Sequence, residues 1–209
     1  MGCLGCGCLV LVLLVILVVG LVAGGCYLGY EKMVGFTSTT PADVPSFNGS
    51  DDVYNAAEQK ITAFEHDVQN HQAATIQLSG DEINTLIARD PEMIRQKVHL
   101  FVTLTNDLAR MQGSVPTSVF AHGFLKDRYL NFDSTFGLGF NSDVKSVDIA
   151  LHHLQVSDQA APENLLPSAQ VYIGALLNAN LQQSPATKDL LQQAKSIEIK
   201  DGELTIETQ

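Results

Sequence analysis

The stretch that decides the fold is residues 129–151, YLNFDSTFGLGFNSDVKSVDIAL. Apolar and polar residues alternate on both sides of Asn141-Ser142-Asp143, three residues that favour a turn. Because side chains alternate between the faces of a strand, we expect a hairpin with one apolar face, which we name the apolar wall. The apolar wall consists of Leu130, Phe132, Phe136, Leu138 and Phe140 on one strand and Val147, Ile149 and Leu151 on the other. Tyr129, Asn131, Asp133 and Thr135 are expected on the opposite face.

The second strand changes phase after Leu151. The next apolar residues, Leu154 and Val156, are one step out of register with it. One extra residue in a strand restores such a register, so we predict a β-bulge at His152-His153.

Further strands are expected on both sides of this hairpin. Residues 97–105 alternate in the same way, Asn106-Asp107 is typical of a tight turn, and a returning strand is expected through Val115. A short strand is expected at residues 74–78. The chain ends in a predicted hairpin, with strands 197–199 and 204–206 joined by Asp201-Gly202.

Helical periodicity predicts the remaining elements. Helices are expected at residues 51–70, 80–90, 91–94, 169–181 and 185–194. Ser79 and Glu82 have the spacing of a capping box at the start of the second of these helices. The helices 51–70 and 169–181 carry spare apolar surface and are expected to cover the apolar wall. The predicted fold class is therefore α+β, with one antiparallel, curved sheet packed against helices in a single domain, residues 51–209.

The first 30 residues have a different character. Leu9–Val22 is a run of Leu, Val and Ile broken only by Gly20, and residues 1–30 contain no charged side chain. About 20 apolar residues in a helix cross a bilayer core, so residues 1–30 are predicted to be an uncleaved transmembrane anchor that contacts the lipid bilayer through Leu9–Val22. A lipoprotein signal ending before Cys26 and a cleaved signal peptide are the alternatives, and both lack the expected basic residues.

Two features bear on how the anchor is arranged. The pair Gly20 and Gly24 and the pair Gly25 and Gly29 have the spacing that allows membrane helices to approach closely, so self-association through the anchor is a hypothesis. Residues 31–50 form a Thr/Ser/Pro-rich spacer that resembles an exported stalk, whereas Lys32 argues for a cytosolic domain. We expect a single-pass membrane protein with its C-terminal domain on the extracytoplasmic side.

Composition limits the chemistry. The formal net charge is −11, which disfavours binding to nucleic acid. All four cysteines lie at positions 3, 6, 8 and 26, so the domain has no disulfide and no cysteine nucleophile. Nucleophile-elbow, phosphate-loop, dinucleotide and His-Glu-x-x-His motifs are absent, and we expect no catalytic residues, no metal site and no cofactor. Asn84 and Asn131 are candidates for buried polar anchors.

Three short segments resemble a known group of proteins. They are residues 78–84 (LSGDEIN), residues 128–131 (RYLN) and residues 196–204. Together with the order of predicted elements, they resemble the small single-pass, membrane-anchored envelope proteins of bacteria typified by the YpmS-like group. The resemblance implies a membrane-tethered, non-enzymatic α+β domain, and it carries no catalytic residues over to this chain.

Two non-catalytic functions are compatible with the sequence, and a third, a hydrolase or other enzyme, has no catalytic motif to support it. The first is a membrane-tethered scaffold or interaction module of the cell envelope. The alternative is a carrier or sensor of a lipid or other apolar ligand, held between the sheet and the helix 169–181, whose apolar stripe is wider than one face needs. Its candidate ligand-binding residues are Leu130, Phe132, Phe136, Leu138, Phe140, Tyr172 and Leu176.

Overall fold

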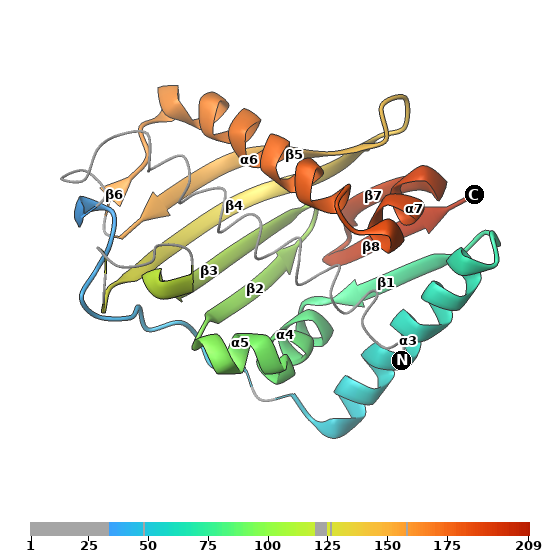
Figure 1. The fold of residues 1–209 in the computed structure, drawn as a ribbon, viewed down its shortest axis with the longest axis horizontal. Coiled ribbons are helices and arrows are strands. Elements are labelled where there is room, and N and C mark those ends of the chain that lie inside the picture. Colours follow the sequence, from blue (N-terminus) through green and yellow to red (C-terminus); the bar gives the residue numbers. More distant parts are fainter. Residues whose placement is uncertain (1–33, 48, 120–124, 126, 158) are drawn as a thin grey trace.

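The protein is represented by a computed structural model that describes residues 34–47, 49–119, 125, 127–157 and 159–209 (Figure 1). The helices are α3 (Asp51–Gln69), α4 (Gly80–Arg89), α5 (Pro91–Gln96), α6 (Leu166–Leu181) and α7 (Pro185–Gln193), with short 3-10 turns at Thr117–Val119 and Glu163–Leu165. The strands are β1 (Thr75–Ser79), β2 (His99–Thr105), β3 (Leu108–Pro116), β4 (Tyr129–Asn141), β5 (Ser146–Val156), β6 (Gln159–Ala160), β7 (Ala194–Lys200) and β8 (Glu203–Thr208).

The predicted anchor lies outside the described residues, together with Leu9–Val22 and the four cysteines. The same holds for the four candidate helix-association residues, so the hypothesis of self-association stays a prediction: Gly20, Gly24, Gly25 and Gly29. No helix in the part of the chain that the structure describes is long and apolar enough to cross a membrane.

The α+β fold class is confirmed, and the strands form two antiparallel sheets where one was predicted. The larger sheet has the order β2-β3-β4-β5-β6, and the smaller has the order β1-β8-β7 (Figure 1). The small sheet joins the terminal hairpin to β1, more than 100 residues earlier in the chain, with Ile76 opposite Ile206 and Leu78 opposite Leu204. Local patterning predicts each strand but carries no information on such a distant partner.

The central hairpin has the predicted register. Phe140 lies opposite Val147, Leu138 opposite Ile149 and Phe136 opposite Leu151. The register then shifts, because Thr135 pairs with His153, and His152 is the extra residue. The predicted bulge is therefore confirmed, and it returns Leu154 to the buried face.

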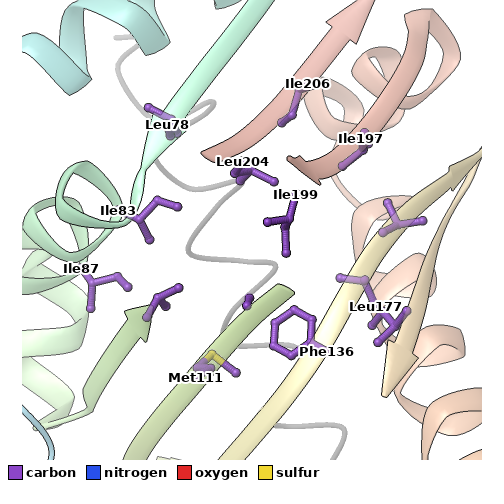
Figure 2. Packing of buried hydrophobic residues seen from close by; sticks show 14 of the residues in the cluster. Leu78, Ile83, Ile87, Met111, Phe136, Leu177, Ile197, Ile199, Leu204 and Ile206 are labelled. Atoms are coloured by element: carbon purple, nitrogen blue, oxygen red, sulfur yellow. The ribbon is translucent and has the colours of Figure 1, made fainter. Parts of the chain in front are cut away.

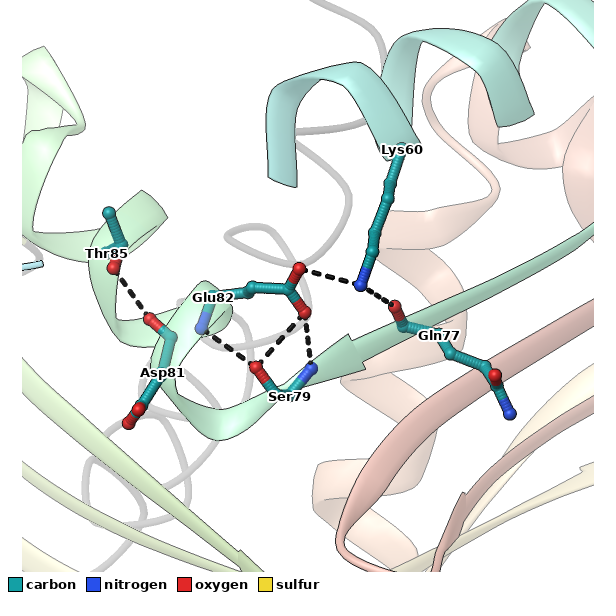
Figure 3. Close-up of polar contacts among 6 residues, drawn as sticks. All are labelled: Lys60, Gln77, Ser79, Asp81, Glu82 and Thr85. Carbon is teal, nitrogen blue, oxygen red and sulfur yellow. Dashed lines mark hydrogen bonds and ion pairs between the residues drawn. The ribbon is translucent and has the colours of Figure 1, made fainter. Parts of the chain in front are cut away.

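Local signals set the helix boundaries. Ser50 caps α3 by accepting a hydrogen bond from the Val53 backbone N–H. The predicted capping box is confirmed at α4, where the Ser79 side chain accepts from the Glu82 N–H and the Glu82 carboxylate accepts from the Ser79 N–H (Figure 3).

The core lies between the two sheets and α6. Figure 2 shows Phe136 and Met111 of the large sheet near Ile199 and Leu204 of the small one, with Leu177 of α6 at one side. The expectation that helix 51–70 covers the apolar wall is corrected, because α3 packs against α4 and β1. Strand β7 packs against β4 in its place, and α6 packs against β5.

Candidate functional site

The apolar wall is the first candidate site, and most of it is buried. Leu130, Phe132 and Phe136 are 3–5% exposed and belong to one continuous core cluster. Gly113 makes room for the Phe132 ring on the neighbouring strand, since a Cβ atom there would overlap that ring and the Leu100 side chain. Leu138 and Phe140 are half-buried at the β4–β5 hairpin end and pack against the same cluster. The five wall residues of β4 therefore lie together, as predicted from their alternation.

The two candidate residues of α6 do not share the position of the wall residues. Leu176 is half-buried and packs against the core, whereas Tyr172 is 38% exposed. The side of α6 that faces the core carries Ile173, Leu177 and Leu181, each about 1% exposed. The wide apolar stripe of this helix thus has a buried side and an exposed side.

Two adjacent histidines lie at the bulge of β5. His152 and His153 are both exposed. Among the residues that the structure describes, no three His, Cys, Asp or Glu side chains gather into a group suited to hold a metal ion.

The face of the large sheet opposite the apolar wall, which we name the outer face, is polar. Arg110 of β3 forms an ion pair with Asp133 of β4, with the Arg110 Nε 3.0 Å from Oδ1 of Asp133. Thr103, Thr135 and His153 extend this polar surface across β2, β4 and β5, because the register pairs Thr103 with Arg110, Arg110 with Thr135, and Thr135 with His153.

One end of the outer face is covered by residues 34–47 and Gly49, which we name the strap. At its start, Arg128 donates hydrogen bonds to Thr37 Oγ1 at 2.6 Å and to the Val34 carbonyl at 2.9 Å. Ser38 and Tyr129 exchange two backbone hydrogen bonds of 2.8 Å each. Side-chain and main-chain bonds together therefore fix Val34, Thr37 and Ser38 of the predicted spacer to the start of β4.

The rest of the strap is held in the same way. The Asn131 amide donates to the Thr40 carbonyl and accepts from the Ala42 N–H, both at 3.0 Å. The Phe47 ring lies 6.5 Å from that of Phe101 on β2. At the far end, Arg89 donates to the Gly49 carbonyl at 2.9 Å. The described part of the predicted stalk, residues 34–47 and 49–50, therefore lies against the domain.

An asparagine amide binds one backbone position on each of the strands β2 and β5 of the large sheet. Asn84 of α4, 2% exposed, accepts from the Val102 N–H at 2.8 Å and donates to the Val102 carbonyl at 2.7 Å. Asn178 of α6 does the same for Val147 on β5, with both distances 2.8 Å. Each amide satisfies backbone groups that an edge strand otherwise offers to another chain. Asn84 was predicted as a buried polar anchor, whereas Asn178 was missed.

Glu82 is the most buried carboxylate with a shifted pKa. Burial opposes its ionisation, but hydrogen bonds from Lys60 and from the Ser79 backbone and hydroxyl outweigh burial and lower the pKa (Figure 3). The Lys60 Nζ lies 2.7 Å from the carboxylate and also donates to the Gln77 carbonyl. Every partner belongs to α3, β1 or the start of α4, so this group of contacts joins structural elements.

A depression on the outer side of α3 is open to solvent. Its lining residues all come from α3: Asn55, Glu58, Gln59, Thr62, Ala63, His66 and Asp67. With lining residues from a single helix, this depression has one wall and does not enclose a ligand.

Arg128 belongs to the RYLN segment that carries the resemblance. That its side chain holds the strap was not predicted from the sequence. An arginine beside a strand and an asparagine in an apolar helix each indicate a polar contact, and neither residue type identifies the partner. No family model matches the chain, and neither the curated proteins nor the solved structures contain a match.

Proposed function

We propose that this protein is a membrane-tethered, non-catalytic module of the bacterial cell envelope that acts as a scaffold and binds a partner protein through the outer face of its large sheet. One observation carries the proposal: Phe132 and Phe136 of the apolar wall are 5% and 4% exposed and packed into the core. We infer that these residues stabilise the fold, and that the partner protein is recognised by surface residues. The outer face offers a rigid platform with both signs of charge at Arg110 and Asp133.

The tether is the predicted anchor, with the bilayer contacted through Leu9–Val22. We propose that the domain lies on the extracytoplasmic side, because residues 31–50 are rich in Thr, Ser and Pro like an exported stalk. Protease added to spheroplasts is then expected to digest the domain. Full protection that is lost only on lysis would put the domain in the cytosol.

A second candidate function is a carrier or sensor of a lipid. The observation that favours it is the half-burial of Leu138 and Phe140, where the apolar wall reaches the hairpin end of the sheet. A bound acyl chain would contact these two residues before the deeply buried aromatics. Tyr172 and Leu176 of α6 belong to this hypothesis as predicted contacts.

Photo-crosslinking in native membranes separates the two functions. A photoreactive residue at Thr103, on the outer face, is expected to give one discrete protein adduct. The matched control is Gln59 on the exposed side of α3, which is expected to give none. A photoreactive residue at Leu138 reports on the carrier. Stoichiometric lipid adducts at Leu138, with no protein adduct at Thr103, would replace the scaffold with the carrier.

A further inference from the structure

Helix α6 belongs to the longest uncharged stretch after the anchor. The chain has 35 charged residues, 12 basic and 23 acidic, and all of them follow Tyr30. None of them, and no histidine, falls in residues 164–187, which include the whole of α6. By contrast α3, of similar length, has charged residues throughout.

The exposed side of α6 is apolar. Val171 is 72% exposed, Leu165 just before the helix is 51% exposed, and Tyr172 is 38% exposed. Ala175 and Ala179 follow Val171 at intervals of four residues and are also exposed. This stripe lies opposite the buried Ile173, Leu177 and Leu181, so one side of α6 is packed and the other is an uncharged surface.

The strap holds the start of the domain close to the predicted anchor. Only residues 31–33 separate Tyr30 from Val34, a reach of about 14 Å for a fully extended chain. Val34 is clamped by Arg128, and the Phe36 carbonyl accepts from the Ser157 hydroxyl at 2.9 Å. Ser157 lies two residues before the start of β6, which is followed by the turn that leads into α6, and Figure 1 places these segments at the same end of the molecule.

We propose that the exposed side of α6 lies in the lipid–water interface of the membrane that holds the anchor, an inference that rests on the proposed tether. A stretched stalk would hold the domain away from the bilayer, whereas a docked strap keeps it within reach. An interfacial helix buries apolar side chains at the level of the headgroups, where a tyrosine ring is favoured. With no basic residue on α6, the contact depends on apolar burial and requires no anionic lipid.

The test uses the full-length chain with its four cysteines replaced by serine, in phosphatidylcholine vesicles. Val171→Cys carries an environment-sensitive fluorophore, and Gln59→Cys on α3 is the matched control. A quencher attached to the lipid acyl chain is expected to quench position 171 at least fivefold more than position 59, and dissolved iodide is expected to show the reverse order. Adding phosphatidylglycerol is expected to leave both results unchanged.

Three results overturn the proposal, and they are distinguishable. Equal quenching at the two positions, with the protein still resistant to carbonate extraction, refutes the contact of α6 and leaves the tether intact. Release of the protein by carbonate refutes the tether itself. Shielding of position 171 from both quenchers, lost when the protein is diluted into excess lipid, means that a second copy covers α6 instead.

Discussion

The two faces of the large sheet are covered in different ways. The inner face, which carries the apolar wall, packs against β7 and α6. None of the residues of the apolar wall has a titratable side chain. The outer face is covered at one end by the strap, through hydrogen bonds that involve backbone groups of residues 34–42. The inner face thus gains stability from buried area, and the outer face gains it from a few directional bonds.

The largest expected effect is on the inner face. Truncation of Phe132 or Phe136 to alanine is expected to lower the free energy of unfolding by about 3–5 kcal/mol, through lost burial and the cavity left behind. Thr135→Ala, the neighbouring position on the outer face, is expected to change it by less than about 0.5 kcal/mol. Chemical denaturation of the three variants measures the difference. Equal losses at positions 135 and 136 would contradict the assignment of Phe136 to the buried face and Thr135 to the outer face.

The predictability of these two faces from the sequence differs for a physical reason. The apolar wall can be predicted because the alternation along β4 and β5 is a local property of the sequence. Even the bulge at His152 appears in the sequence, as a one-residue shift in the alternation of apolar residues. The docking of the strap cannot be predicted from the sequence, because the strap bonds to the domain through backbone groups of Thr37, Thr40 and Ala42. Every residue type carries such groups. A Thr/Ser/Pro-rich segment without a period reads as a linker whether it is docked or free.

The candidate ligand-binding residues of the apolar wall also show what local alternation can and cannot predict. Leu130, Phe132 and Phe136 were correctly placed on one face, yet their alternation cannot distinguish a filled core from a ligand cavity. That distinction depends on what packs opposite, and both the pairing of β8 with β1 and the packing of β7 against β4 join segments far apart in the chain. Asn178 illustrates the limit from the polar side, since its amide needs a partner and only the fold supplies Val147.

Two glycine-to-alanine substitutions, one on each face of the large sheet, test the same comparison with a smaller change in side-chain volume. Gly113→Ala introduces a methyl group into the space of the Phe132 ring, and over-packing of this kind is expected to cost about 1–3 kcal/mol. Gly139→Ala, where the nearest atom to the new methyl group is the Asp148 Cβ at 4.0 Å, is expected to be neutral or to stabilise by up to about 1 kcal/mol. Thermal unfolding measures both.

A double variant sharpens the result for Gly113. If the cost comes from the Phe132 ring, then Phe132→Leu is expected to remove part of it, so that the double variant is more stable than the sum of the single changes predicts. Strict additivity would refute the close contact between Gly113 and Phe132.

The strap is tested at Arg128. Arg128→Gln removes the charged donor to Thr37 and Val34, with an expected loss of about 1–2 kcal/mol. Hydrogen exchange gives the specific readout: the backbone amides of Ser38 and Tyr129 are expected to exchange about tenfold faster, while those of β5 stay protected. Arg95→Gln is the control, because Arg95 is exposed and bonds only to Glu92 within α5 among the described contacts.

A strap that is docked only weakly would give a different result. In that case the Ser38 amide already exchanges freely in the unaltered protein, and Arg128→Gln changes neither exchange nor stability. The domain would then have the range of motion of a stalked protein, and the proximity of α6 to the anchor would lose its support.

The smallest expected effect belongs to the Arg110–Asp133 pair in the middle of the outer face. Its geometry is bidentate, but the Arg110 side chain is 55% exposed and that of Asp133 is 20% exposed, so water and salt screen the attraction. A double-mutant cycle with Arg110→Gln and Asp133→Asn is expected to give a coupling of about 0.2–1 kcal/mol, and the coupling should fall further in 1 M salt. A coupling above about 2 kcal/mol that persists in salt would show that the pair is desolvated and that the outer face is covered beyond the strap. In the proposed scaffold the pair is free to reorganise when a partner binds, so the same two changes are expected to abolish the protein adduct at Thr103 while leaving the fold intact.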